Sequence, residues 1–559
     1  MQRDCAALAG QEFDVAIIGG GAFGAAAAWH SALRGLRTAL IERSDFGGGA
    51  SAECFKMVHG GIRYLQHADL ARLRSSCHER SELLRLAPHL VAPLPIVIPT
   101  YGRGRKGKAF LGAGMRLYDL LTLDRNARIR DPARRISGTR FLGRSEILGL
   151  FPSLEAAGLT GGAIFEDGQM YSPPRLVLEF VKSAVRQGAV ACNYVEAVRF
   201  RWQRDRICGA IARDRLNGEE FEIRARLILN AAGPGAEYLL EEDERFGHWR
   251  RGVFSRDACF VVRRKPRSRY ALAVQGWSRD RDSLLGREAR HMFIVPWRDY
   301  SLVGVWHKPV SDHPDAVRVD EMELGKWIEE INACYPELAL TRDDVVYKNC
   351  GLVPFGTNSV GTDELSFGKE SRFIDHSRVH RVGGLVTLVG IRFTNARGDS
   401  AKALELLLRQ LPGAPLSADT STVTLAGGRI DDFDSFRSQA QNTRPGFVSP
   451  DSLDGLLRNY GTEYTDVLQL SRENGGDGER IPGAVTLGVE ITHAVQCEMA
   501  VRLEDVVLRR TDLGSGSHPG TAAIHAVADR MQRLLGWSAD RRRQEVESAE
   551  AALMRHGAA

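Results

Sequence analysis

The sequence lacks the cysteine pattern of a disulfide-stabilised or zinc-binding domain. Its nine cysteines are scattered and odd in number, and no two of them are spaced C-x-x-C. This distribution argues against a disulfide framework and against a structural zinc site, and it favours a reducing compartment. We therefore predict no metal site and a cytoplasmic location.

Long apolar runs are also missing. No uninterrupted stretch approaches the roughly 20 apolar residues of a membrane-spanning helix, and residues 1–14 hold no apolar core of a signal peptide. The charge is nearly balanced, with 75 basic and 70 acidic residues, which argues against a nucleic-acid binder. The 43% hydrophobic and 26% charged fractions are those of an ordinary globular protein, which we expect to be soluble or peripheral to a membrane.

A strand, a glycine-rich turn and a helix follow one another near the N-terminus. The apolar run 13–18 leads into Gly19-x-Gly21-x-x-Gly24, a helical stretch follows to residue 34, and a second strand ends at Glu42. In this setting glycines permit a tight turn and a close approach of pyrophosphate, while the helix N-terminus offers N–H groups to the phosphates. The acid can accept a hydrogen bond from an adenosine ribose. The pattern predicts a dinucleotide-binding βαβ unit in a parallel sheet.

Two later segments favour FAD over NAD as the dinucleotide. The strand predicted over 221–229 ends in Asn230-Ala-Ala-Gly233-Pro, although an ordinary strand-ending turn explains that segment equally well. The strand predicted over 383–389 ends at Gly390 before a helix, where N–H groups can meet the electron-rich edge of a flavin. Three separated segments that converge on one extended cofactor suit FAD better.

Residues 56–65, KMVHGGIRYL, combine polar side chains with two adjacent glycines. The glycines let backbone approach a flat ring, and His59, Arg63 and Tyr64 project polar groups beside it. The alternative is a glycine turn with a salt-bridged arginine and a packed tyrosine.

Seven segments are more distinctive in combination than alone: DVAIIGGGAFG, IER, KMVHGGIRYLQ, LLRLAPHL, NAAGP, GIRFTNAR and the C-terminal segment 490–514. Together they resemble the FAD-dependent glycerol-3-phosphate dehydrogenase family over about residues 12–540. The resemblance implies an α/β fold, α+β overall, with a Rossmann-like FAD-binding domain, an antiparallel-sheet substrate domain and a C-terminal helical domain.

The same resemblance divides the chain into an FAD-dependent oxidoreductase region at 12–419 and a helical domain at 420–559. Within the first region, the FAD-binding parts are expected at about 12–75, 155–250 and 350–415, and the substrate-domain parts at about 76–154 and 251–349.

Members of that family oxidise the C2 carbinol of sn-glycerol 3-phosphate to dihydroxyacetone phosphate, with hydride transfer to flavin N5 and electrons passed to a quinone. The implied partners are a phosphorylated small substrate and a quinone, without nucleic acid. A homodimer and peripheral contact with the cytoplasmic membrane face stay open. The implied catalytic residues are His59, Arg63, Tyr64, Arg372 and Arg392. The implied FAD-binding residues are Gly19, Gly21, Gly24, Glu42, Arg43, Ser51, Lys56, His59, Val195, Gly233, Gly390, Arg392 and Thr394.

Three single positions and one turn depart from the family pattern. Val353 stands where a phosphate-binding arginine is expected, Arg392 replaces a lysine, and Cys259 stands where a histidine close to the flavin is expected. The family's G-T-T-D turn reads Gly-Val-Trp-His at 304–307, and the tryptophan could stack on a sugar or simply fill the core. These changes keep other functions open: oxidation of another polyol phosphate, an amine or a hydroxy acid, or flavin binding without turnover.

Two further clusters of charge carry weaker predictions. A basic stretch before the apolar residues 110–121 suits docking on an anionic membrane, although a solvated loop and a core-facing helix explain it equally well; its basic residues are Arg103, Arg105, Lys106 and Lys108. Arg509 and Arg510 are expected to be ordinary charge partners of Glu504 and Asp505.

Overall fold

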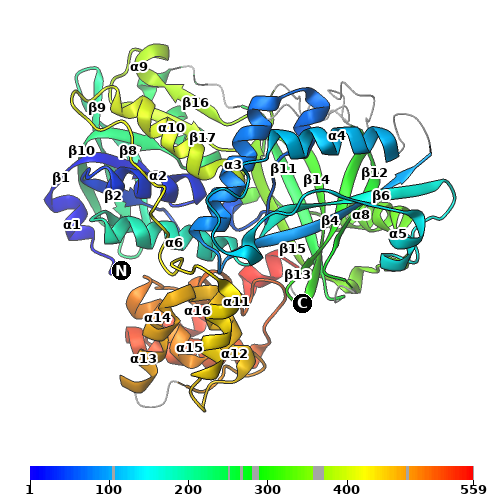
Figure 1. Ribbon diagram of the computed structural model, residues 1–559. Coiled ribbons are helices and arrows are strands. Elements are labelled where there is room, and N and C mark those ends of the chain that lie inside the picture. The colour runs from blue at the N-terminus through cyan, green and yellow to red at the C-terminus, as the bar shows by residue number, and fades with distance from the viewer. Residues whose placement is uncertain are drawn as a thin grey trace.

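The computed structural model describes residues 1–102, 108–247, 249, 252–264, 268–279, 289–356, 370–473 and 478–557. Within these ranges the strands form two sheets that lie side by side, and a body of C-terminal helices packs below them in the view of Figure 1. This arrangement confirms the mixed α/β fold and the helical C-terminal region that the sequence predicts.

The first sheet is parallel at its centre and carries the predicted βαβ unit. Its order is β16-β17-β10-β1-β2-β7, and the pairs from β17 to β7 are parallel. The hairpin β8–β9 extends β10 in antiparallel fashion, and β16 pairs antiparallel with β17. The strands are β1 (Glu12–Ile18), β2 (Thr38–Ile41), β7 (Val190–Cys192), β8 (Val195–Gln203), β9 (Arg206–Asp214), β10 (Glu220–Asn230), β16 (Arg372–Asp375) and β17 (Leu385–Val389).

Small side chains let the helices of this half pack closely. In α2 (Ala22–Leu33) the alanines at 25–28 are fully buried, so α6 (Pro173–Arg186) and α10 (Ala396–Leu408) both pack against it. The shorter helices of this half are α1 (Cys5–Gly10), α7 (Ala236–Glu241) and α9 (His376–Val379).

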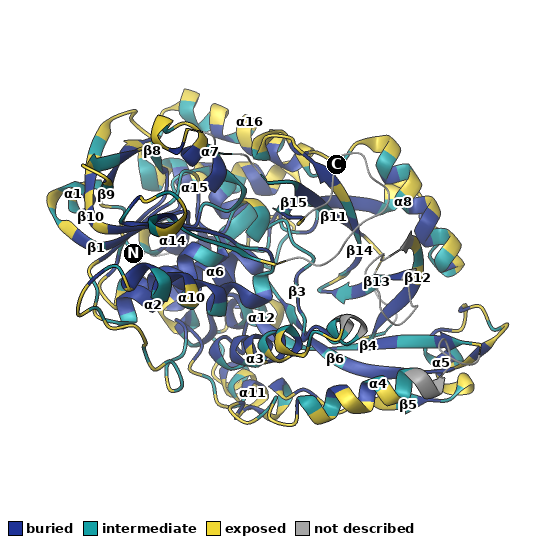
Figure 2. Cartoon of the chain, turned by 90° about the horizontal axis from the view of Figure 1, so that it is seen from above, coloured by how far each residue is buried: buried dark blue, intermediate teal, exposed yellow. Residues whose placement is uncertain are grey.

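The second sheet is antiparallel apart from the β12–β4 pair, and its order is β15-β11-β14-β13-β12-β4-β6-β3 with β5 beside β6. Figure 2 shows its buried strands covered by helices whose outer faces are exposed. The strands are β3 (Met57–Val58), β4 (Val91–Tyr101), β5 (Arg140–Leu142), β6 (Leu159–Met170), β11 (Phe254–Val262), β12 (Ala271–Arg279), β13 (Ala289–Trp297), β14 (Tyr300–Val310) and β15 (Val345–Pro354). The helices around it are α3 (Leu70–Leu86), α4 (Lys108–Leu121), α5 (Arg144–Leu150) and α8 (Glu321–Cys334).

Two of these strands, β3 and β6, lie within parts of the sequence expected to bind FAD, and the boundary expected near residue 350 falls inside β15. Residues 12–75 and 155–250 are expected in the FAD-binding half, whereas β3 and β6 pair with each other within the second sheet, which also holds all of β15. These strands give no local sign of which sheet they join, because sheet membership depends on pairing with distant strands.

The C-terminal body is helical, and its last helix returns to the second sheet. The helices are α11 (Phe433–Asn442), α12 (Pro450–Tyr460), α13 (Tyr464–Glu473), α14 (Gly488–Cys497), α15 (Thr521–Leu535) and α16 (Ala539–Arg555). Directly after α16, the His556 carbonyl accepts from the Lys348 amide at 2.6 Å, and the His556 ring stacks on Tyr347.

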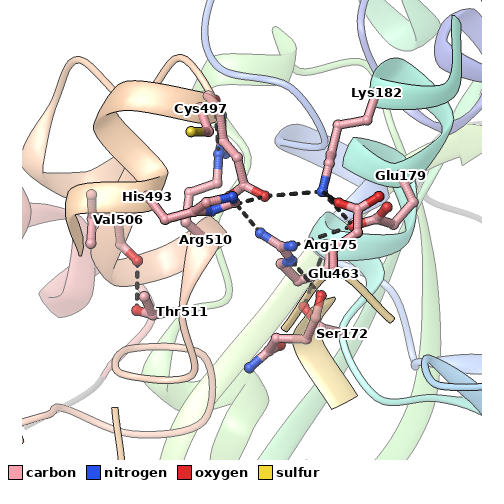
Figure 3. A network of polar contacts seen from close by, with 12 residues as sticks. Ser172, Arg175, Glu179, Lys182, Glu463, His493, Cys497, Val506, Arg510 and Thr511 are labelled. Carbon is pink, nitrogen blue, oxygen red and sulfur yellow. Dashed lines mark hydrogen bonds and ion pairs between the residues drawn. The ribbon is translucent and has the colours of Figure 1, made fainter. Parts of the chain in front are cut away.

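Buried ion pairs join α6 to the C-terminal body (Figure 3). Arg175 donates to Glu498 at 2.6 Å, and Lys182 donates to Glu463 at 2.6 Å and to Glu498 at 3.4 Å. All of these side chains are at most 10% exposed. The pairs therefore fix helices that are about 300 residues apart in the sequence.

The prediction for Arg509 is confirmed, since it pairs with both Glu504 and Asp505, and the prediction for Arg510 is wrong. Arg510 is buried and forms a bidentate pair with Asp45, at 2.6 and 2.7 Å, so it holds the C-terminal body against the loop after β2. Arg509 pairs with Asp505 as expected but also with Asp45, at 2.8 Å. Sequence proximity favoured the local acids because the distant one becomes a neighbour only in the folded chain.

The membrane predictions gain little from the fold. No helix of the described residues is long and apolar enough to cross a membrane. On α4, Leu117 and Leu120 are exposed while Met115 is buried. Arg103, Arg105 and Lys106 lie outside the described residues.

Candidate active site

A cavity of about 1350 Å³ opens where the carboxyl ends of the parallel strands meet the face of the second sheet. Ligands of open α/β sheets bind at such strand ends. The wall is built from segments at both ends of the chain, from Ile18 to His556.

At one end of the cavity, the glycine motif packs as tightly as the sequence predicts. A Cβ added to Gly24 would lie 1.8 Å from the Gly19 carbonyl oxygen, so α2 can approach β1 only through glycine. Gly19 has φ +105°, and Gly21 lines the cavity at the N-terminus of α2. Ser51 Oγ accepts from the Ala22 amide at 2.9 Å and so holds the 49–51 turn beside this helix start.

The carboxylate of Glu42 stands beside the glycine turn. It accepts from the amides of Gly20 at 2.7 Å and Ser44 at 2.9 Å, and it lines the cavity. Burial raises the pKa of Glu42, while the two backbone donors oppose that rise. The carboxylate is thereby oriented toward the place where a ribose hydroxyl would meet it.

The turn that holds His313 and Asp315 covers this nucleotide end of the cavity. Arg43 pairs with Asp315 at 2.5 Å, and His313 packs edge-on against Tyr238 with ring centres 4.5 Å apart. Val195 and Gly233 also line this part of the wall. Sequence analysis gives no signal for the residues of the covering turn, since about 270 residues separate the charged partners.

At the other end, four predicted residues come together. Tyr64 accepts from Arg392 Nη1 and lies 4.9 Å beneath its guanidinium, and Thr394 Oγ1 accepts from the His59 amide at 3.1 Å. His59, Tyr64, Arg392 and Thr394 all line the cavity. Arg72, which sequence analysis missed, rests on the same Tyr64 ring at 5.4 Å and also lines the wall.

Gly390 lines the cavity too, and its lack of a side chain has a visible packing reason. An added Cβ would lie 2.1 Å from the ring of Phe23, which packs against the glycine. The glycine pair at 60–61 likewise makes room for neighbours. A Cβ on Gly60 would meet Tyr118 Oη at 2.4 Å and Arg80 at 2.5 Å, and a Cβ on Gly61 would meet the Tyr64 ring at 2.2 Å.

Asp167 supports this loop from behind. Its Oδ1 accepts from the Gly60 amide at 2.6 Å and from the fully buried Arg80 at 2.7 Å. Burial raises the pKa of Asp167, and Arg80 opposes that rise. The Asp167–Arg80 pair holds the loop that carries His59. No local motif in the sequence indicates this pair.

Other predicted residues are not on the cavity wall. Lys56 is buried, donates to Asn349 at 3.0 Å and lies 5.0 Å over Trp297. Arg372 pairs with the buried Glu237, and Gly24 lies behind the glycine turn. The backbone of Arg63 lies in the turn Ile62–His67, while its side chain is outside the described part of the structure.

The second sheet supplies the departures from the family pattern other than Arg392. Cys259 and Val353 line the cavity, and burial raises the pKa of the Cys259 thiol to about 12. Trp306 fills the core, stacked between Phe260 and Trp327 at 5.3 and 4.7 Å, so the sugar-stacking alternative is wrong. Strand alternation explains this result, because the neighbouring His307 faces the cavity instead.

Comparisons with known proteins agree with this geometry. A family model described as FAD dependent oxidoreductase matches residues 14–396, and one described as the C-terminal domain of alpha-glycerophosphate oxidase matches residues 418–542. A glycerol-3-phosphate dehydrogenase of Synechocystis sp. is 30% identical over 546 residues, which cover 96% of this chain and 95% of that protein. The chain belongs to the FAD-dependent glycerol-3-phosphate dehydrogenase family.

Two more members of this family extend the likeness. A glycerol-3-phosphate dehydrogenase of Mycobacterium leprae is 30% identical, over 97% of this chain and 88% of that protein. The solved structure of a glycerol-3-phosphate dehydrogenase from Bacillus halodurans, complexed with FAD, superposes with a TM-score of 0.75 at 22% identity. It covers 99% of this chain and 96% of that one, and it confirms the fold.

FAD is accordingly the cofactor, as predicted, and the cavity fits it. The glycine turn leaves no room for side chains where a pyrophosphate must approach, and α2 directs its N-terminus at that point. Glu42 offers a buried, oriented carboxylate for a ribose. The cavity then continues to the second sheet, as a cofactor longer than a single nucleotide requires.

Proposed function

We propose that this protein is a dehydrogenase that oxidises sn-glycerol 3-phosphate to dihydroxyacetone phosphate and passes the electrons to a quinone. One observation carries the proposal. A single cavity joins a dinucleotide-binding turn to an end that holds arginine, tyrosine, threonine and histidine side chains. The relatives named as glycerol-3-phosphate dehydrogenases support the choice of substrate.

In this proposal the cofactor lies along the wall from Glu42 to Thr394. Gly19, Gly21 and the start of α2 hold the pyrophosphate, and Glu42 holds the ribose of the adenosine. The turns around Ser51 and Gly390 face the flavin end. When bound, FAD supplies the acceptor for a hydride from the substrate carbon.

The substrate phosphate binds at Arg392 and Tyr64. A guanidinium offers paired donors to a phosphate oxygen pair, and the phenol beneath it fixes its orientation. Arg72 stacks on the same ring and is itself paired with Asp69 and Glu370. These groups would compensate for the arginine that Val353 replaces.

The substrate hydroxyl must also lose its proton as the hydride leaves. The histidines that line the cavity include His59 beside Tyr64 and His307 on the second sheet. Each ring is held by neighbours: His59 lies edge-on to Tyr64 at 6.4 Å, and His307 contacts Asp257.

A second candidate function is oxidation of a secondary alcohol or amine without a phosphate dianion. Val353 removes a cation from the wall, and the Asp257 carboxylate lines the same wall. On β11, Asp257 stands two positions from Ser255, the residue opposite Val353. A negative charge there disfavours a dianion and favours a neutral or cationic group.

Anaerobic mixing of the flavin-loaded protein with single substrates tests both candidates. The panel holds glycerol 3-phosphate, other polyol phosphates, glycerol, amino acids and hydroxy acids. The proposal expects fast bleaching of the flavin by glycerol 3-phosphate and slow or no bleaching by glycerol. Fast bleaching by amino acids, hydroxy acids or glycerol alone would instead establish the second candidate.

Electron transfer to a quinone calls for contact with a membrane, which holds the quinone pool. The exposed leucines of α4 are the apolar surface that we assign to this contact. Flotation with anionic and neutral vesicles tests it. Replacement of Leu117 and Leu120 by serine should reduce binding, and unchanged binding would remove α4 from the proposal.

A further inference from the structure

An aspartate and a histidine face each other on neighbouring strands of the cavity wall. Asp257 on β11 is the register partner of His307 on β14, and His307 Nδ1 lies 2.6 Å from Asp257 Oδ1. Both residues line the cavity, with side chains 25% and 8% exposed. Ser255 Oγ donates to the same Oδ1 at 2.5 Å.

The position of the pair on the sheet places it in the cavity wall, with the Nε2 atom of His307 buried. Alternation puts Ser255, Asp257 and Cys259 on one face of β11. The residue opposite Asp257 on the other neighbouring strand, β15, is Gly351. Its missing side chain lets the segment 50–53 approach β15 closely, since an added Cβ would lie 3.0 Å from the Glu53 carbonyl oxygen.

The contact with Asp257 selects the form of the histidine. When Nδ1–H donates to the carboxylate, the lone pair of a neutral imidazole is on Nε2. A carboxylate in this position also stabilises the imidazolium that forms when Nε2 takes up a proton. The arrangement is therefore suited to accept a proton from a group held in the cavity.

This pair also differs from the family pattern that the sequence resembles. That pattern has a histidine at position 259 and the acid of the G-T-T-D turn at position 307, whereas this chain has Cys259 and His307, with an acid at 257. The thiol of Cys259 is a poor replacement, since burial raises its pKa to about 12. A histidine–acid pair is thus present, with the two residue types on exchanged strands.

We propose that His307 accepts the proton of the substrate hydroxyl and that Asp257 positions the His307 ring. The inference rests on the proposed function. The O–H proton moves to Nε2 of His307, the C–H hydrogen leaves with both bonding electrons as a hydride to the flavin, and the C–O bond becomes a carbonyl. The imidazolium later releases its proton to water.

Several ionisable groups on neighbouring segments share this part of the wall and would influence the pH dependence. They are Asp257 and Cys259 on β11, Lys348 and Cys350 on β15, Arg318 after β14, and Glu53 on the loop below β15.

The kinetic test compares His307→Asn, Asp257→Asn and His59→Asn in the FAD-loaded protein. Loss of a general base slows the chemical step by about 10²–10⁴-fold. We expect that loss in anaerobic flavin reduction by glycerol 3-phosphate for His307→Asn, with little change in KM. The rate should lose its rise with pH, and added imidazole should restore part of it. His525→Asn, on the exposed face of α15, is the matched control.

The second readout does not depend on turnover. In 15N-histidine NMR spectra of the FAD-loaded protein, the signals lost in His307→Asn identify this residue. Wild type should carry its proton on Nδ1 at neutral pH, and Asp257→Asn should move the ring toward the other tautomer. A proton on Nε2 in wild type would overturn the inference whatever the substrate is.

Two kinetic outcomes would also overturn it. His307→Asn could keep the wild-type rate while His59→Asn loses it, which would identify His59 as the acceptor. A higher KM with unchanged kcat would instead show that the pair only binds substrate. If wild type is not reduced by glycerol 3-phosphate, the proposed function fails. The same variants are then compared on the substrate that does reduce the flavin.

Discussion

Two regions of this protein concentrate buried charge, and they use it differently. On α6, Arg175 and Lys182 form ion pairs with carboxylates from α6 itself and from the C-terminal body (Figure 3). In the cavity, Arg392 stacks on and donates to a tyrosine, and a histidine meets an aspartate. The first region joins parts of the fold, whereas the second presents polar groups to a ligand. Substitutions in the first should therefore act on stability and those in the second on chemistry.

The largest expected effect concerns the cofactor end of the cavity. Gly24→Ala would place a Cβ 1.8 Å from the Gly19 carbonyl oxygen, so the turn that receives the pyrophosphate cannot keep its shape. We expect purified Gly24→Ala to retain little FAD, measured as the ratio of flavin to protein absorbance. Gly149→Ala, where nothing lies within 4 Å of the added atom, is the control. Equal FAD content in both variants would contradict the assignment of the turn.

The next effect concerns the ion pairs of the first region. Glu498→Ala removes the carboxylate nearest to the buried Arg175 and a second partner of Lys182. Breaking a buried pair costs about 3–5 kcal/mol. Denaturant unfolding of the FAD-loaded protein measures the change in free energy. The exposed pair of Glu405 with Arg409 is the control, since Glu405→Ala should cost less than about 1 kcal/mol. Similar losses in both variants would show that the buried pairs have no special role.

The stability of the same region should also depend on pH. Burial raises the pKa of Glu179 to about 7 from an ordinary value of 4.5. The folded state therefore holds this proton more tightly than the unfolded state, so the stability it contributes is present below pH 4.5 and is lost as pH rises toward 7. Glutamine does not titrate. Relative to wild type, Glu179→Gln should gain on the order of 2–3 kcal/mol between pH 4.5 and 8.

Unfolding curves of the two proteins at pH 4.5, 6 and 8 measure this difference. A difference that stays constant with pH would mean that the pKa of Glu179 is the same in the folded and unfolded states. If wild type were less stable than Glu179→Gln only at low pH, folding would lower the pKa of Glu179 instead.

The smallest effect concerns the substrate end. Arg392→Ala removes a charge-assisted contact with phosphate worth about 1.5–3 kcal/mol, which corresponds to a rise in KM of about 10–150-fold. The effect should be confined to anionic substrates, and Arg392→Lys should restore part of it. Steady-state KM values for glycerol 3-phosphate and glycerol measure the contrast. An equal rise for both substrates would argue against an anion site at this arginine.

How much could be predicted varies with how local the cause is. The glycine motif and Glu42 could be recognised because strand, turn and helix are consecutive in the chain, and the structure brings them to one end of the cavity. His59, Tyr64, Arg392 and Thr394 could be named because their segments resemble a family. Lys56 and Arg372 were named in the same way, yet their side chains pair with Asn349 and Glu237, away from the wall.

The residues that were missed have no local signature. In the sequence, Asp257 and Asp167 are each a single acid within a strand, and Arg72 is a single charge on a helix. Each gains its meaning from a partner on a different segment, such as His307 or Arg80. The Arg510 prediction failed for the same reason, since its partner Asp45 is 465 residues away.

The sequence by itself determined the elements, the dinucleotide turn and the family, because periodicity, glycine spacing and motif order are local properties of the chain. Only the tertiary structure decided which sheet β6 and β15 join, which arginines face the cavity, and which histidine meets a carboxylate. Those outcomes depend on pairings across hundreds of residues. Burial and register, which set the pKa and tautomer of each side chain, arise only when those distant segments pack together.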